Sequence, residues 1–218
     1  MKDFLEEGAG PDGLPNHPWR FHREDRVARF TLATPDGRQT LSPGILRRLA
    51  GGITRAAASG AALAVVDSVV PGIFAAGANL RVIRALEPAE GYAFARTGQE
   101  ALTEISEAPC ATIAEIDGAC FGGALDLAMA CDVRIATPSA SFCHPGPRVG
   151  IVTGWGGTVF ARRILGSGRA RRLFRAGEVF DARSALDFGL IDEVVEPERW
   201  GARRREIEDC LVEVSCFL

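Results

Sequence analysis

Lysine is almost absent from this sequence, although arginine is common. Lys2 is the only lysine among 218 residues, so a lysine general base or a Schiff base with a carbonyl substrate is excluded for a site in the folded body. An excess of positive charge is also lacking, because the formal net charge is -3 at pH 7. The overall field that attracts nucleic acid is therefore missing, and we expect no nucleic-acid partner.

Closely paired cysteines and long apolar stretches are lacking as well. The six cysteines include no C-x-x-C pair, which predicts free thiols of a cytosolic protein and no metal site. No apolar run is long enough for a transmembrane helix. The acidic N-terminus lacks the basic start and apolar stretch of a signal peptide. These absences predict a cytoplasmic protein without a membrane partner.

The sequence does contain enough apolar residues for one core, since 47% of its side chains are hydrophobic. We expect a flexible N-terminal arm at residues 1–25, a core domain at 26–200 and a short helical tail at 201–218. Buried strands alternate with helices, which is typical of an α/β fold. The expected strands are 26–33, 61–70, 111–116, 132–136 and 190–195. One helix is expected to begin at Ser42, and further helices are expected at 94–107, 123–131, 156–165, 169–175 and 181–188.

Two glycine-containing turns each follow a buried strand and open a helix. Such turns leave unpaired N–H groups at the positive end of a helix dipole, where an oxyanion is stabilised. Gly77 permits the first bend and leaves the N–H of Ala78 available. In the second turn, Gly122 and Gly123 let a ligand approach the backbone without a β-carbon in the way. Two such donors aimed at one oxygen would form an oxyanion hole. Taken alone, the same glycines also fit ordinary turns and close helix–strand packing.

Four motifs in order resemble the enoyl-CoA hydratase/isomerase, or crotonase, family. They are FAAGANL at 74–80, IDGACFGGALDLAMACDVRIAT at 116–137, GIVTGWGGTVFARRILG at 150–166 and DARSALDFGLIDEVVE at 181–196. The resemblance implies a spiral of ββα units, assembled as a trimer or hexamer, that binds acyl-CoA. It implies no cofactor beyond the coenzyme A of the substrate.

The resemblance also implies roles for particular residues. The two oxyanion donors of the family fall on Ala78 and Gly123. We expect the substrate to contact the two turns and two aromatic rings, at Ala76, Gly77, Gly122, Phe121 and Trp155.

The catalytic acids depart from the family pattern. Hydratases of the family carry two glutamates, and here Asp126 stands at the first position and Gly146 at the second. Asp126 follows the Gly123 donor by one helical turn, so it is a candidate acid or base; alternatively, it is a first-turn carboxylate that stabilises its own helix. His144 is a candidate second proton-transfer group beside the missing glutamate, or a structural histidine. Cys143 precedes it and is expected to point to the opposite face of the strand.

The leading hypothesis is an enzyme of the enoyl-CoA hydratase/isomerase type, acting on an acyl thioester of CoA or of a carrier protein. It would be a lyase or isomerase that stabilises an enolate, while Gly146 argues against hydratase activity. The chain also ends soon after Glu196, without the C-terminal subdomain usual in relatives, so we expect an open site or one completed by another subunit. The alternatives are a non-catalytic accessory subunit of a biosynthetic enzyme, and a hydrolase of thioester or carbon–carbon bonds.

Overall fold

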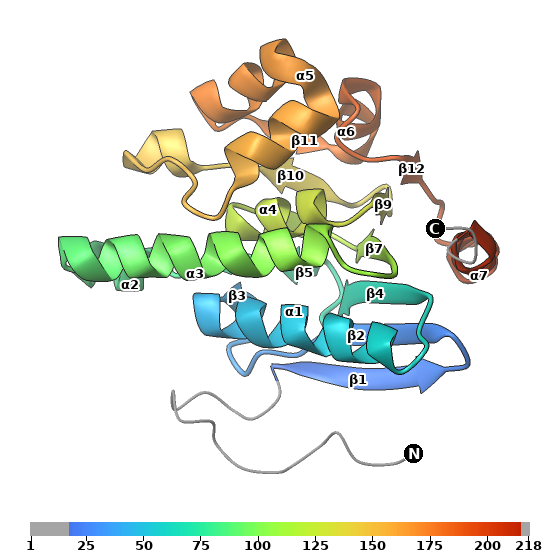
Figure 1. Ribbon diagram of the computed structural model, residues 1–218. Helices are drawn as coiled ribbons and strands as arrows, with labels where there is room; N and C mark the ends of the chain where they lie inside the picture. Colours follow the sequence, from blue (N-terminus) through green and yellow to red (C-terminus); the bar gives the residue numbers. More distant parts are fainter. Residues whose placement is uncertain (1–17, 215–218) are drawn as a thin grey trace.

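The fold is built on a six-stranded sheet (Figure 1), and the computed structural model describes residues 18–214. The first two strands of the sheet are antiparallel, and each further strand runs parallel to its neighbour. Across the sheet the strands are β1 (Trp19–Glu24), β2 (Val27–Leu32), β4 (Leu63–Ser68), β7 (Ala111–Ile116), β9 (Val133–Ala136) and β12 (Glu193–Val194).

A second, four-stranded sheet is formed by short strands that follow those of the first. Its strands, in order, are β11 (Val179–Asp181), β10 (Ser141–Cys143), β8 (Ala119–Phe121) and β5 (Ile73–Ala75). The pairs β4–β5, β7–β8 and β9–β10 each place one strand in each sheet before the chain enters a helix. This repeated ββα unit confirms the predicted α/β spiral. A separate parallel pair joins β3 (Thr40–Leu41) to β6 (Gly77–Ala78).

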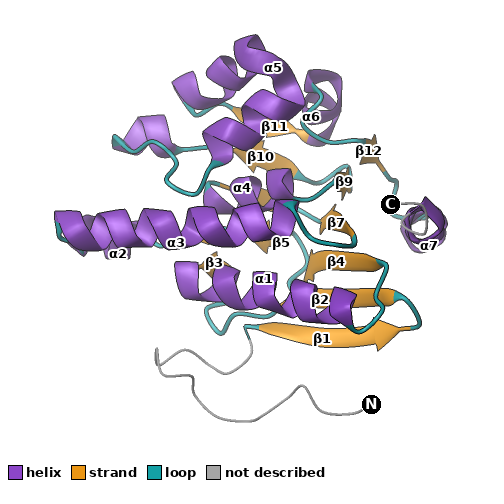
Figure 2. Ribbon diagram, viewed as in Figure 1, coloured by secondary structure: helices purple, strands orange, loops and turns teal. Residues whose placement is uncertain are grey.

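Helices cover the sheets, and α1 and α3 lie side by side across the first sheet (Figure 2). The helices are α1 (Pro43–Ala58), α2 (Leu80–Ala85), α3 (Pro88–Ser106), α4 (Gly123–Ala130), the 3-10 turn η1 (Gly146–Val149), α5 (Gly157–Ala176), α6 (Ala182–Phe188) and α7 (Trp200–Val214). The element labelled α5 consists of two helices separated by a kink at Gly166, where φ is +74°, in agreement with the two helices predicted at 156–165 and 169–175.

The start of α1 shows how the sequence sets a helix boundary. The Ser42 hydroxyl accepts a hydrogen bond from the N–H of Ile45 at 3.2 Å, and Pro43 occupies the first turn. The buried face of α1 packs on the sheet, where Phe30, with 2% of its surface exposed, lies against Gly52. The helix predicted from Ser42 is therefore confirmed.

A smaller apolar cluster lies on the other face of the main sheet, under α7. Leu63, Val65, Ile113 and Ile135 alternate along their strands with residues of the main core, and Trp200 and Ile207 of α7 pack against them. Alternate residues of a strand point to opposite faces, so these strands are covered on both sides. Helix α7 lies at the right of the molecule in Figure 1.

A buried charge cluster joins α7 to the sheet. The Arg29 guanidinium bonds Asp67 at 2.7 Å, Glu115 at 2.8 Å, and the carboxylate of Glu208, the buried residue of α7. Burial raises the pKa of Glu115 to about 8, although the Arg29 charge opposes this shift. The cluster therefore holds more carboxyl groups than its central cation can neutralise.

The N-terminal arm predicted at residues 1–25 is wrong for its last part, because Trp19–Glu24 form β1. Every residue of β1 pairs with β2, and the Trp19 and Phe21 rings lie 6.3 and 5.2 Å from the Phe30 ring. The alternation of Trp19 and Phe21 with polar residues carries the period of a strand with one buried face. The rest of the arm and the end of the tail, 1–17 and 215–218, lie outside the described residues.

Two further expectations concern compartment. Within residues 18–214, no helix has both the length and the apolar character needed to cross a bilayer. The described cysteines are free thiols, namely Cys110, Cys120, Cys131, Cys143 and Cys210, while Cys216 lies outside the described part.

Candidate functional site

The two predicted glycine turns touch each other. Gly77 has a φ of +76°, and a β-carbon on it would lie 2.5 Å from the Phe121 carbonyl oxygen and 2.7 Å from the Gly123 nitrogen. Only glycine allows both this backbone conformation and this approach. The first turn, between β5 and β6, therefore lies directly against the start of α4.

Both predicted oxyanion donors lie at this junction. Helix α4 begins at Gly123, so no carbonyl of the helix is available to the N–H of that residue. The N–H of Gly122 instead donates to the Cys143 carbonyl at 2.8 Å. Ala78 lies opposite Leu41 in the β3–β6 pair, which fixes its backbone beside the second turn.

A cavity of about 350 Å³ opens in front of these turns. Seven of the nine predicted site residues line it: Ala76, Ala78, Gly122, Gly123, Asp126, His144 and Trp155. Apolar side chains form much of the remaining wall, including Leu80, Ile83, Leu86, Phe94, Val149 and Ile151. Gly77 and Phe121 do not line the cavity; they contact each other behind it. The cavity combines apolar walls with a few polar groups, as is usual for small-molecule sites.

Asp126 is buried at the base of the cavity, with 1% of its surface exposed. The Thr153 hydroxyl donates to Oδ2, and Oδ1 lies 3.4 Å from His144 Nε2. A β-carbon on Gly157, the first residue of α5, would collide with Oδ1, so the positive end of α5 faces this carboxylate. Asp126 thus lies in the first turn of α4, but its carboxylate interacts with residues outside that helix.

His144 follows β10 and is buried beside Asp126, with 5% of its surface exposed. Among the described residues, neither ring nitrogen has a hydrogen-bond partner. The Phe174 ring packs edge-on against the imidazole, with centroids 4.9 Å apart. The imidazole is therefore held by packing and leaves polar atoms available to a ligand in the cavity.

Cys143 points away from the cavity, as predicted for its place in the strand. Its Sγ donates to the Gly177 carbonyl at 3.3 Å, and burial raises the pKa of the thiol. A thiol of raised pKa that donates to a carbonyl is a poor nucleophile. Among residues 18–214, no group of three or more His, Cys, Asp or Glu side chains is arranged to hold a metal ion.

At Gly146, where the resemblance predicts the second glutamate of the family hydratases, the backbone leaves no room for a side chain. A β-carbon there would lie 2.3 Å from the Ile151 carbonyl oxygen. The turn is closed by the Ile151 N–H, which donates to the Gly146 carbonyl at 2.9 Å. The position is therefore rebuilt around glycine and offers no second carboxylate.

Trp155 packs between two glycines and is 3% exposed. A β-carbon on Gly123 would lie 2.3 Å from Trp155 Cζ3, and one on Gly98 of α3 would lie 2.1 Å from Cδ1. The Phe94 ring stacks on the indole at 5.4 Å between centroids. Trp155 therefore both lines the cavity, as predicted, and contacts the residue that carries the second N–H.

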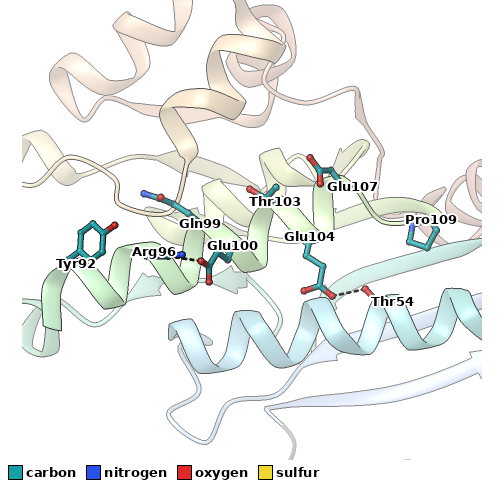
Figure 3. A pocket seen from close by; sticks show the side chains of 9 residues that line it. All are labelled: Thr54, Tyr92, Arg96, Gln99, Glu100, Thr103, Glu104, Glu107 and Pro109. Carbon is teal, nitrogen blue, oxygen red and sulfur yellow. Dashed lines mark hydrogen bonds and ion pairs between the residues drawn. The ribbon is translucent and has the colours of Figure 1, made fainter. Parts of the chain in front are cut away.

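A second cavity, of about 730 Å³, lies on the outer face of α3 (Figure 3). Its polar side chains largely bond one another: Arg96 pairs with Glu100 at 2.7 Å, and Thr54 donates to Glu104 at 2.7 Å. Seven of the predicted site residues, including the buried Asp126 and His144, line the smaller cavity instead. The smaller cavity is therefore the candidate active site.

Comparison with known proteins agrees with this geometry. The family model for enoyl-CoA hydratase/isomerase matches residues 22–214. This chain belongs to the enoyl-CoA hydratase/isomerase family. The match begins within β1 and extends through α7, so it includes both glycine turns and the whole cavity.

Two relatives of known function illustrate the range. A short-chain-enoyl-CoA hydratase of Clostridium acetobutylicum is 30% identical over 191 residues, which cover 87% of this chain and 73% of that protein. The mitochondrial methylglutaconyl-CoA hydratase of Mus musculus is 36% identical over 137 residues, covering 63% of this chain and 44% of the relative. The aligned segment thus spans less than half the length of the mouse protein.

Solved structures show the same fold. An enoyl-CoA hydratase from Bacillus anthracis superposes with a TM-score of 0.82 at 25% identity, over 89% of this chain and 76% of that chain. Pseudomonas aeruginosa DspI superposes with a TM-score of 0.83 at 26% identity, over 97% of this chain and 78% of that chain. The crotonase fold predicted from the four motifs is confirmed.

Thr153 is a site residue that the sequence analysis missed. A threonine in a loop carries no periodic signal, and its partner Asp126 is 27 residues away in the sequence. The contact of the predicted Trp155 with Gly98 was also missed, although Gly98 lies within α3 and a glycine inside a helix often marks the close approach of another group.

Proposed function

We propose that this chain binds an acyl thioester and polarises its carbonyl with the N–H groups of Ala78 and Gly123. Asp126, assisted by His144, then moves a proton at the carbon next to that carbonyl. The supporting observation is the convergence of these four residues on one largely apolar cavity. Amides that meet the developing oxyanion stabilise an enolate, and each such donor contributes on the order of 3 kcal/mol in known enzymes.

The reaction class follows from the number of carboxyl groups. Two carboxylates line the cavity, Asp126 and Glu87. Glu87 is exposed at the start of α3, so Asp126 is the one buried acid or base beside the proposed oxyanion site. An isomerase or lyase that shuttles a proton through Asp126 and His144 needs no second glutamate. The acyl group would be carried by CoA or by a carrier protein, and the protein would act as a homo-oligomer.

The test is solvent deuterium incorporation at Cα of a bound acyl-CoA, measured by mass spectrometry over a panel of thioesters. The wild-type chain should exchange this proton, and Asp126→Asn should slow the exchange by about 10²- to 10⁴-fold, the range for loss of a general acid or base. Asp187→Asn is the matched control, because Asp187 is an exposed aspartate that pairs with Arg183. Equal exchange in Asp126→Asn and wild type would refute the role of Asp126.

The rebuilt turn at Gly146 favours one second candidate, a non-catalytic accessory subunit. Thermal unfolding separates the two, because a ligand at a hundred times its Kd stabilises the folded state by about 2.7 kcal/mol. The enzyme hypothesis requires such a shift with a CoA thioester. Absence of a shift, together with co-purification of a partner enzyme, would favour the accessory role. Release of free acid from the thioester would instead indicate a hydrolase that uses His144.

A further inference from the structure

We propose that the loop Thr153–Trp155 positions both chemical groups of the site, with Thr153 orienting the Asp126 carboxylate and Trp155 fixing the Gly123 N–H. The inference rests on the proposed function and adds two positioning residues to it. Neither residue needs to exchange a proton with the substrate for this role.

The Thr153 hydroxyl has a defined direction. Its oxygen accepts a hydrogen bond from the backbone N–H of Trp155 at 3.4 Å, and its single proton is donated to Asp126 Oδ2. Oδ2 is thereby occupied, while Oδ1 has no hydrogen-bond partner among the described residues and lies 3.4 Å from His144 Nε2. Thr153 thus determines which carboxylate oxygen is left to exchange a proton with His144 or a substrate.

Trp155 acts on the other group, the N–H of Gly123. The six-membered ring of its indole contacts Gly123 so closely that a β-carbon there would overlap Cζ3 and Cε3. On its other side, the indole contacts Gly98 and stacks on Phe94. Because the indole fills the space between α3 and the start of α4, it fixes how far the first turn of α4 can move.

The loop itself is anchored to α3 from outside the cavity. Gln99 Nε2 donates to the Gly154 carbonyl at 2.7 Å, and Gln99 projects from the outer side of α3 in Figure 3. A β-carbon on Gly154 would lie 3.2 Å from Ala95 Cβ, so the loop backbone also packs tightly on the helix. Three successive loop residues are therefore held by three different partners.

The first experiment compares Thr153→Val and Thr153→Ser in the deuterium-exchange assay, at saturating and at low thioester concentration. Valine keeps the shape and removes both the donor to Asp126 and the acceptor of the Trp155 backbone N–H. The maximal exchange rate should therefore fall on the order of 10²-fold, with KM unchanged. Serine retains the hydroxyl and should restore most of the rate. Thr158→Val, an exposed threonine at the start of α5, is the control and should match wild type. A wild-type rate in Thr153→Val, a loss confined to KM, or failure of serine to rescue would each overturn the proposal.

A second experiment does not depend on activity. Gln99→Leu removes the anchor of the loop without altering the cavity wall. The N–H groups of Leu125 and Asp126 bond the Gly122 carbonyl in the first turn of α4, and their exchange should become about fivefold faster, as expected for one lost hydrogen bond. Thr103→Val, on the same exposed face of α3, should leave this exchange unchanged. Unchanged protection of Leu125 and Asp126 in Gln99→Leu would overturn the positioning role.

The two experiments also separate the two proposals. If the wild-type chain exchanges no substrate proton, the proposed function fails, whereas faster amide exchange in Gln99→Leu would still support the positioning of Gly123 by the loop. If wild type exchanges the proton but the loop variants behave like their controls, the proposed function stands and the positioning role is refuted.

Discussion

The position of Gly146 leads to a prediction about restoring the family's second glutamate. Gly146→Glu places a carboxylate where the hydratases of the family carry one, so it looks like a route to hydration of an enoyl-CoA. The backbone opposes this outcome. The new β-carbon would start 2.3 Å from the Ile151 carbonyl oxygen, whereas real β-carbons essentially never lie closer than 3.0 Å to such an atom. The turn must therefore open by roughly 0.7 Å or more before the side chain fits.

The cost of that opening can be worked out from its parts. Overpacking in a tightly packed region costs about 1 to 3 kcal/mol. Opening the turn also weakens the bond from the Ile151 N–H to the Gly146 carbonyl, which contributes about 1 kcal/mol. We therefore expect Gly146→Glu to lower the free energy of unfolding by about 2 to 4 kcal/mol. We also expect no hydratase activity, because the turn that lines the cavity must be displaced before the side chain fits.

The assay is urea unfolding, combined with measurement of crotonyl-CoA hydration. Gly168→Glu is the control, because Gly168 lies in α5 with nothing within 4 Å of its β-carbon position; it should be close to wild type in both measurements. If Gly146→Glu is as stable as Gly168→Glu and hydrates crotonyl-CoA, the steric argument and the reaction class inferred from it are both refuted.

Three further predictions concern the fold and the site. Burial raises the pKa of Glu115 to about 8, so the contribution of this group to stability is present below its ordinary pKa of about 4.5 and is lost as the pH rises to 8. The urea midpoint should therefore fall with pH across that range, and Glu115→Gln should make this fall smaller. An equal fall in the variant and wild type would contradict the pKa shift. Gly77→Ala should abolish the thermal shift given by an acyl-CoA, because the new β-carbon would collide with the second turn. Gly72 has a φ of +77°, but nothing lies within 4 Å of its β-carbon position, so Gly72→Ala should retain the thermal shift despite similar backbone strain. Equal behaviour of the two variants would argue against close contact of the two turns. Asp181→Ala should cost about 1 kcal/mol in urea unfolding, because the Asp181 carboxylate accepts the Ser184 N–H at 2.7 Å at the start of α6; no loss would mean that this cap contributes nothing.

The local patterns of the sequence predicted much of the fold. The strand 111–116 has the predicted bounds, and Ser42 begins α1 as its capping chemistry indicates. Bounds were less accurate where tertiary packing decides them. Helix α3 starts at Pro88, well before the predicted start at 94, because its first turns cover the cavity and lack the regular apolar spacing of a core-facing helix.

The site was predictable where backbone conformation makes it and unpredictable where distant side chains meet. Glycines after buried strands indicate turns with available N–H groups, so Ala78 and Gly123 are oxyanion donors predicted from the sequence, and the structure places both on the cavity wall. That Asp126 turns toward α5, and that Thr153 meets it, depends on how two helices pack. Gly146 was recognised as a missing glutamate, but only the distance to Ile151 shows that the loop cannot readily take one back.

The attachment of α7 has a consequence for handling this protein. The helix covers Leu63, Val65, Ile113 and Ile135 on the outer side of the main sheet, and its own buried residue is the charged Glu208. A shortened version lacking α7 would expose these apolar side chains to water and would leave the Arg29 guanidinium without its Glu208 counterion. An exposed apolar patch promotes self-association, so a truncated chain should aggregate even though every residue around the cavity is still in place.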